Sequence, residues 1–172
     1  MKRIYWALAI LLSLCWQASL AENVSFPGVP DIPLKPGLSY GGFFKKHQPV
    51  KILFAVGQTG PQLKESLINA ALVIKYLKAK GYKYKIHFVL YGKAVLVADV
   101  FNQKYGNWAP LLEELHKQGV TFTVCHNAMV LSRVESADVY PFMKVIPAGI
   151  LSVAEYEMKG YSPIFNSNAD SE

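Results

Sequence analysis

The amino-acid sequence predicts an α/β fold, with a mostly parallel sheet of about five strands and helices on both faces. One observation is the near-continuous apolar run at 50–56, which is typical of a strand buried on both faces. Another is that such runs alternate with helical patterns along the chain. The third is that short glycine-rich turns join them, as is usual between parallel neighbours.

The elements follow in chain order. After the strand at 50–56 and a turn at 57–61, one apolar stripe predicts a helix over 64–80, and Gly81 ends it. Further strands are expected at 84–91, 120–125, 143–146 and 161–164, and further helices at 93–101, 108–118, 128–137 and 150–159. Pro163 has no N–H to donate, so the last strand should lie at a sheet edge.

The first 21 residues predict a signal peptide that is cleaved after Ala21. A short basic start precedes an apolar run at 4–16, and Ser19 and Ala21 are the small residues that a cleavage site needs. The run is shorter than the roughly 20 residues of a membrane-spanning helix. We therefore expect a periplasmic or secreted protein without membrane insertion after cleavage, and an uncleaved membrane anchor is the alternative.

Composition narrows the class of protein. The net charge of +6 would fall to +4 with the loss of Lys2 and Arg3, and the remaining basic residues are scattered. Scattered lysines indicate a solvated surface, so no nucleic-acid binding is predicted. The four histidines lie far apart without cysteine pairs, so we predict no metal site and no cofactor. No Ser-His-Asp order or carboxylate pair stands out. Residues 49–165 form one predicted domain, and 166–172 form a polar tail.

A proline- and glycine-rich arm at 22–48 precedes the domain. Its spacing of Pro and Gly excludes a helix and predicts an extended segment with turns. The arm also carries aromatic residues, which predict that it packs against the domain or a neighbouring subunit: Phe26, Tyr40, Phe43 and Phe44.

The candidate site residues follow the carboxyl ends of the strands, where parallel sheets place their ligand sites. Four loops contribute them: Gly57 and Gln58; Tyr91 and Gly92; Cys125, His126 and Asn127; Pro147 and Gly149. The turn at 57–60 offers backbone amides to an anion. It lacks the spacing of a nucleotide-binding loop, so a plain turn is the favoured interpretation. His87 lies inside an apolar strand and is expected to be a core or interface histidine.

Cys125 would be the one thiol left after Cys15 is removed with the signal peptide. Exported proteins meet oxidising conditions, so an odd cysteine must be buried, protected by assembly, paired or used. If Asn127 caps the next helix, the helix N-terminus favours a thiolate at Cys125, and His126 adds a possible proton acceptor. The alternative is a small apolar residue at a strand end. We expect a presented thiol.

Three segments carry a resemblance to a known family: "IHFVLYGKAV", "LLEELHKQGVTFTVCHNAM" and "MKVIPAGILSVAEYEMKGYSPI". Over roughly 50–164 the chain resembles the DsrE/DsrF-like family of sulfur-relay proteins, and its exported, uncharacterised members most closely. The resemblance implies a three-layer α/β/α fold and assembly into trimers or hexamers. It also implies that the cysteine closing this strand, here Cys125, carries persulfide sulfur between a donor and an acceptor protein.

Two functions are predicted. The first is an exported persulfide carrier that acts through Cys125. The alternative is an oligomeric small-ligand-binding or structural module in which this cysteine is not catalytic. A homo-oligomer is expected in either case, because 52% of the residues are hydrophobic and 13% aromatic. The aromatic residues expected in exposed loops are Phe43, Phe44, Trp108, Tyr140 and Phe142.

Overall fold

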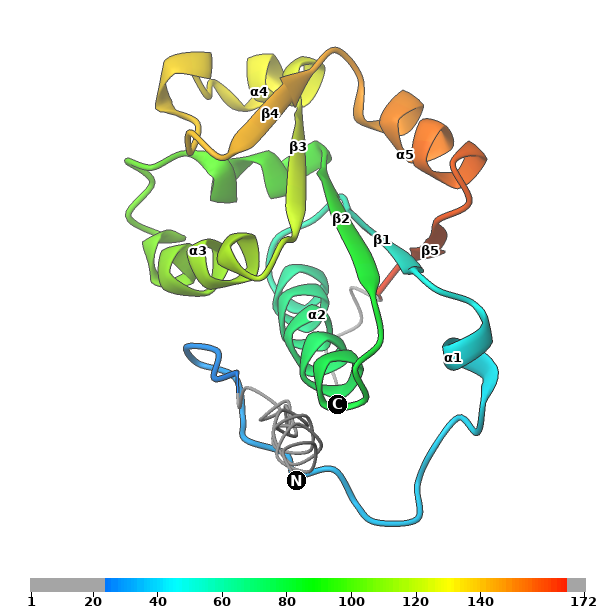
Figure 1. Ribbon diagram of the computed structural model, residues 1–172. Coiled ribbons are helices and arrows are strands. Elements are labelled where there is room, and N and C mark those ends of the chain that lie inside the picture. Colours follow the sequence, from blue (N-terminus) through cyan, green and yellow to red (C-terminus); the bar gives the residue numbers. More distant parts are fainter. Residues whose placement is uncertain (1–23, 167–172) are drawn as a thin grey trace, which may run out of the picture.

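The computed structural model of the protein describes residues 24–166 (Figure 1). The predicted signal peptide at 1–21 and the tail beyond Asn166 lie outside the described residues.

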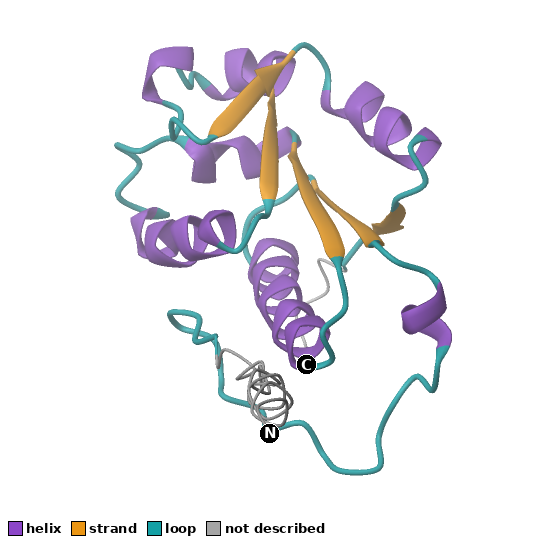
Figure 2. Cartoon of the chain, in the orientation of Figure 1, coloured by secondary structure: helices purple, strands orange, loops and turns teal. Residues whose placement is uncertain are grey.

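Five strands form one sheet in the order β4-β3-β2-β1-β5, and all neighbours are parallel (Figure 2). Their bounds are β1 Val50–Val56, β2 Tyr84–Leu90, β3 Thr121–Cys125, β4 Met143–Ile146 and β5 Ser162–Ile164. The predicted parallel sheet of about five strands is confirmed. Pro163 lies in β5 at the edge of the sheet, as expected for a residue without an N–H.

Helices cover both faces of this sheet, which gives three layers. They are α2 Pro61–Ala79, α3 Ala109–Lys117, α4 His126–Ser132 and α5 Gly149–Met158, with 3-10 helices η1 Gly92–Ala98, η2 Gly106–Trp108 and η3 Ser136–Asp138. Successive strand residues point to opposite faces. Phe54, Phe88 and Phe122 pack into one core cluster with α2 and α3, whereas Leu53, Ala55 and Val89 pack with α5.

Several helix boundaries differ from those predicted. The first long helix begins at Pro61, which fits its first turn because the missing N–H has no intrahelical partner there. The helix expected at 93–101 is a 3-10 helix that ends at Ala98. The helix expected at 128–137 begins at His126 and ends at Ser132, because Arg133 takes a left-handed conformation with φ 58°.

The arm contains one helical turn, α1 Phe43–Lys46, so the prediction of no helix there was wrong. The turn begins directly after Gly42, where the run of glycine and proline stops. Phe26 is only 4% exposed and belongs to the main core cluster, and the Tyr40 ring packs edge-on against Tyr76 of α2 at 5.6 Å. The start of the arm therefore belongs to the fold, while Phe43 is exposed.

Of the five aromatic residues expected in exposed loops, Phe43 is exposed and Phe44 is half-buried. Trp108, Tyr140 and Phe142 pack half-buried against the main core cluster, so their expected exposure was wrong. Other large apolar side chains are exposed instead, and Met158 at the end of α5 reaches 89%. The exposed apolar surface thus lies partly on α5, where Ile150 and Leu151 are also exposed.

Candidate functional site

The four predicted loops meet at the carboxyl edge of the sheet. Their closest approach is around Tyr91. A Cβ built on Gly57 would lie 2.9 Å from the Tyr91 ring, and one built on Gly149 would lie 2.6 Å from Tyr91 Cβ. A Cβ built on Gly92 would meet the Gly57 carbonyl oxygen at 2.4 Å. Glycine at these three positions is what lets the loops approach one another so closely.

Cys125 ends β3 within this group of loops. It pairs with Ile146 of β4 in the parallel register, and its Cβ would lie 3.2 Å from a Cβ on Gly149. The residue is 6% exposed and belongs to the main core cluster. The expectation of a presented thiol is therefore not met in the single chain. The start of α5 covers the end of β3, a contact between segments that are distant in sequence.

The first turn of α4 follows Cys125 without an intervening residue. Cys125 is itself the N-cap, with φ −74° and ψ 111°, so the hypothesis that Asn127 caps this helix was wrong. The Asn127 N–H donates instead to the Pro147 carbonyl at 3.3 Å, which ties α4 to the loop before α5. His126 is exposed at the first position of α4. The thiol thus lies at the N-terminus of α4, where backbone N–H groups favour an anion.

The turn at 57–60 is occupied by the chain itself. The Gly57 and Gln58 N–H groups both donate to Gln62 Oε1 at 2.8 Å. Gln62 Nε2 in turn donates to the Asn166 carbonyl at 2.9 Å. The plain turn is confirmed, since the amides that would bind an anion already have partners. Sequence reasoning missed Gln62, although a glutamine in the first turn after a glycine loop is a signal for such a contact.

His87 is buried beside a set of hydroxyl groups on the α5 side of the sheet. The ring is 1% exposed, its Nδ1 lies 2.6 Å from Thr121 Oγ1, and its Nε2 lies 3.0 Å from Thr123 Oγ1. Tyr156 of α5 stacks on it with ring centroids 3.7 Å apart. Burial lowers the pKa of His87 to about 3, and Lys159 adds to this while Glu155 opposes it. The expected core histidine is confirmed, and it is neutral at pH 7.

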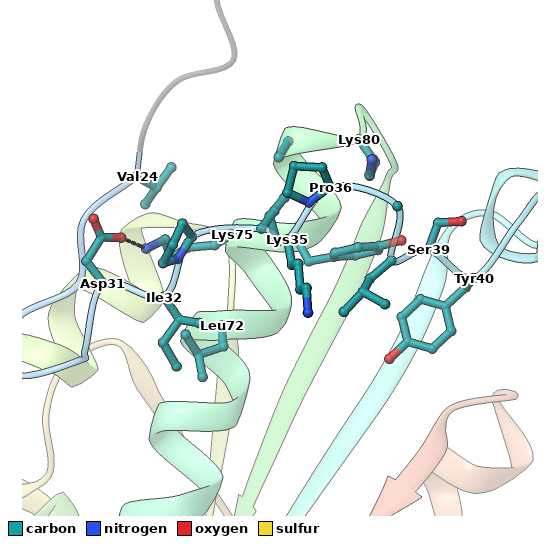
Figure 3. Close-up of a pocket in the computed structure, with 16 residues that line it drawn as sticks. Val24, Asp31, Ile32, Lys35, Pro36, Ser39, Tyr40, Leu72, Lys75 and Lys80 are labelled. Carbon is teal, nitrogen blue, oxygen red and sulfur yellow. Dashed lines mark hydrogen bonds and ion pairs between the residues drawn. The ribbon is translucent and has the colours of Figure 1, made fainter.

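A groove of about 890 Å³ lies away from this edge, between the arm and α2 (Figure 3). Ile32 and Leu72 line it, and Asp31 of the arm forms an ion pair with Lys75 of α2. Lys35 and Lys80 add positive charge to the same groove.

Two further findings concern the part of the chain that the structure describes. Within residues 24–166, no helix is both long and apolar enough to cross a membrane. The same part of the chain holds no group of three or more His, Cys, Asp or Glu side chains that could bind a metal ion.

These features define a class of α/β protein. Its sheet is all-parallel, and a cysteine lies at the carboxyl edge of the sheet among closely packed glycines. The chain belongs to the DsrE/DsrF-like family, whose sequence model matches residues 51–165. The arm precedes the matched region. A comparison with curated proteins finds no match.

The solved structures that are similar to the chain include the following two. A protein of unknown function, MTH1491 from Methanobacterium thermoautotrophicum, has 21% sequence identity and a TM-score of 0.55, over 66% of this chain and 96% of its own. The ychN protein from E. coli has 18% identity and a TM-score of 0.48, over 67% of this chain and 97% of its own. The first likeness supports the fold alone.

Proposed function

We propose that the protein is an exported sulfur carrier that holds persulfide sulfur on Cys125. Family membership suggests a protein of the sulfur-relay type. The observation that carries the proposal is the position of Cys125, which closes β3 and caps α4 at the edge where the four loops meet. This is the position to which the resemblance assigns the sulfur-carrying cysteine.

The reaction is a transfer of one sulfur atom between thiols. The Cys125 thiolate attacks the outer sulfur of a donor persulfide R–S–SH. The donor S–S bond breaks, R–S⁻ leaves, and Cys125 becomes Cys–S–SH with the proton retained on the outer sulfur. Discharge to an acceptor thiolate repeats the step in the other direction, so neither half needs an oxidant or a reductant.

The test is loading with a small-molecule persulfide. The full chain carrying Cys15→Ser is mixed with glutathione persulfide, separated from it and weighed by intact mass spectrometry. We expect a gain of one sulfur atom that a reductant removes, and no gain in the matched Cys15→Ser, Cys125→Ser chain. Unchanged mass in the first chain, while Cys125 in the same sample reacts with an alkylating agent, would reject sulfur carriage.

The burial of Cys125 favours a second candidate, an oligomeric module that binds a small ligand or serves a structural role. In that case the cysteine is alkylated only when the chain unfolds. Native mass spectrometry of the purified protein would then show a retained ligand or a bare oligomer.

Export and assembly belong to the same proposal. N-terminal sequencing of the protein recovered from its natural compartment should begin at Glu22. The exposed apolar side chains of Val130 and Leu131 on α4 support a homo-oligomer, because surfaces of this kind usually mark interfaces. A donor or an acceptor protein would meet the carboxyl edge of the sheet.

A further inference from the structure

One face of helix α5 contacts β2 and β3 along a line from Cys125 to His87. Gly149, its first residue, packs against Cys125, with 3.2 Å between the cysteine Cβ and a Cβ built on the glycine. One turn later, Ser152 Oγ lies 3.4 Å from Thr123 Oγ1. One further turn on, the Tyr156 ring stacks on His87 at 3.7 Å with 8° between the ring planes. The same helix therefore covers both the thiol and the buried histidine.

The anchoring of α5 is light compared with that of α2. Of its ten residues, only Gly149, Ser152 and Val153 are buried, and Val153 is the sole large apolar side chain among them. Helix α2 buries eight of nineteen residues, most of them apolar. Segments with few buried apolar contacts open locally at lower free energy than the whole domain unfolds. We therefore expect α5 to leave the sheet more readily than α2.

The contact between His87 and α5 depends on the charge of the ring. A neutral imidazole has one N–H and one acceptor nitrogen, and both threonine hydroxyls can serve either role. A protonated ring has two donors and carries a charge beneath Tyr156, where water is excluded. Seating of α5 on the sheet therefore favours the neutral ring, and a lifted α5 returns the ring to water.

The charged groups around His87 change its pKa less than burial does. On α5, the Glu155 carboxylate forms an ion pair with Lys159. On β1, Leu53 lies beside His87 in the sheet register, and Lys51 Nζ donates to the Lys159 carbonyl. The remaining titratable or charged side chains nearby, on the β2, β4 and α5–β5 segments, are Lys85, Lys144 and Tyr161. Glu155 raises the pKa of His87 by more than Lys159 lowers it, so burial under α5 is what keeps the ring neutral while α5 lies on the sheet.

We propose that α5 is a lid over Cys125 and that protonation of His87 releases it. The biological meaning of the lid rests on the proposed function, since it would make sulfur exchange at Cys125 respond to acidity. The physical content does not rest on it, because access to a thiol is measurable without any sulfur transfer. In the closed state Gly149 covers the thiol, and in the open state a donor persulfide reaches it.

The test measures access to Cys125 as a function of pH. The full chain carrying Cys15→Ser reacts with 4,4′-dithiodipyridine at pH 7.5 and at pH 5, and each rate is divided by that of the same chain unfolded in denaturant at the same pH. This division removes the effect of pH on the fraction of Cys125 that is present as thiolate. We expect the normalised rate to be about 30-fold higher at pH 5, as follows from a pKa of 6.5 for His87 in the open state and about 3 in the closed state.

Matched variants assign the effect to one histidine. His87→Gln should abolish the increase, whereas His126→Gln, which removes an exposed histidine next to Cys125, should keep it. Equal normalised rates at the two pH values in the parent chain would overturn the proposal. So would an undiminished increase in His87→Gln.

Hydrogen exchange of the parent chain gives a second measurement that needs no variant. Amides of α5, corrected for the intrinsic effect of pH, should be less protected than those of α2 at both pH values and should lose about 30-fold of their protection between pH 7.5 and pH 5. Equal protection of the two helices at both pH values would mean that the domain opens only as a whole and would overturn the lid. Increased access without persulfide formation on Cys125 would reject sulfur carriage and leave the lid in place.

Discussion

Lowering the pH from 7 to 5 should destabilise the folded domain through His87. Burial, the largest cause, lowers the pKa of His87 from 6.5 to about 3. Between these two values the unfolded chain binds a proton that the folded chain does not, so the free energy of unfolding falls as the pH falls. The contribution of the neutral ring is complete above pH 6.5 and is lost progressively towards pH 3.

The structure also gives the size of this effect. A difference of one pKa unit corresponds to about 1.4 kcal/mol. For a ring that is 1% exposed, the loss between pH 7 and pH 5 is about 2 kcal/mol. Carboxyl groups titrate mostly below this window, near pH 4. The window therefore reports mainly on histidine.

Urea unfolding at pH 7, 6 and 5 measures this loss. The parent chain should lose about 2 kcal/mol more than His87→Gln over the window, and His126→Gln should behave as the parent. The same pH dependence in the parent and in His87→Gln would refute the assignment of a buried, neutral His87.

Three other predictions concern packing and assembly. Gly149→Ala should destabilise the domain by about 1–3 kcal/mol, because the new Cβ would lie 2.6 Å from Tyr91 Cβ. Gly106→Ala is the control and should not destabilise it, because nothing lies within 4 Å of the Cβ built there. Equal unfolding free energies for the two variants would contradict the close approach at Gly149. Phe26→Ala should lower the free energy of unfolding by about 3–5 kcal/mol, and Phe43→Ala, at an exposed position, by less than about 0.5 kcal/mol. An unchanged melting temperature for Phe26→Ala would show that the arm is a free tail. Light scattering at micromolar concentration should give an oligomer that Leu131→Lys on α4 weakens, and a monomer mass for the parent chain would reject assembly.

The order of the elements could be predicted because each strand and helix carries its own pattern. The run at 50–56 is apolar except for Lys51 because β1 has a helical layer on each side, and the stripe on α2 marks the face that it buries. The gathering of Gly57, Tyr91 and Gly149 follows from the parallel sheet alone, because every strand brings its carboxyl end to one edge.

The details of the site depend on contacts that sequence patterns do not specify. Burial of Cys125 requires α5 to begin at Gly149, on top of a strand that ended 24 positions earlier. The hydroxyl partners of His87 depend on the register of β2 against β3, which places Thr121 opposite it. The failed Asn127 cap has a local cause, since the chain enters α4 directly from β3 and leaves no room for a loop.

Discharge of sulfur from Cys125 tests the central claim most directly. The loaded chain carrying Cys15→Ser, freed of donor, is mixed with an acceptor thiol, and both partners are weighed over time. A carrier predicts that Cys125 returns to a free thiol while the acceptor gains one sulfur atom. A mixed disulfide between Cys125 and the acceptor, or sulfur that stays on Cys125, would contradict the account.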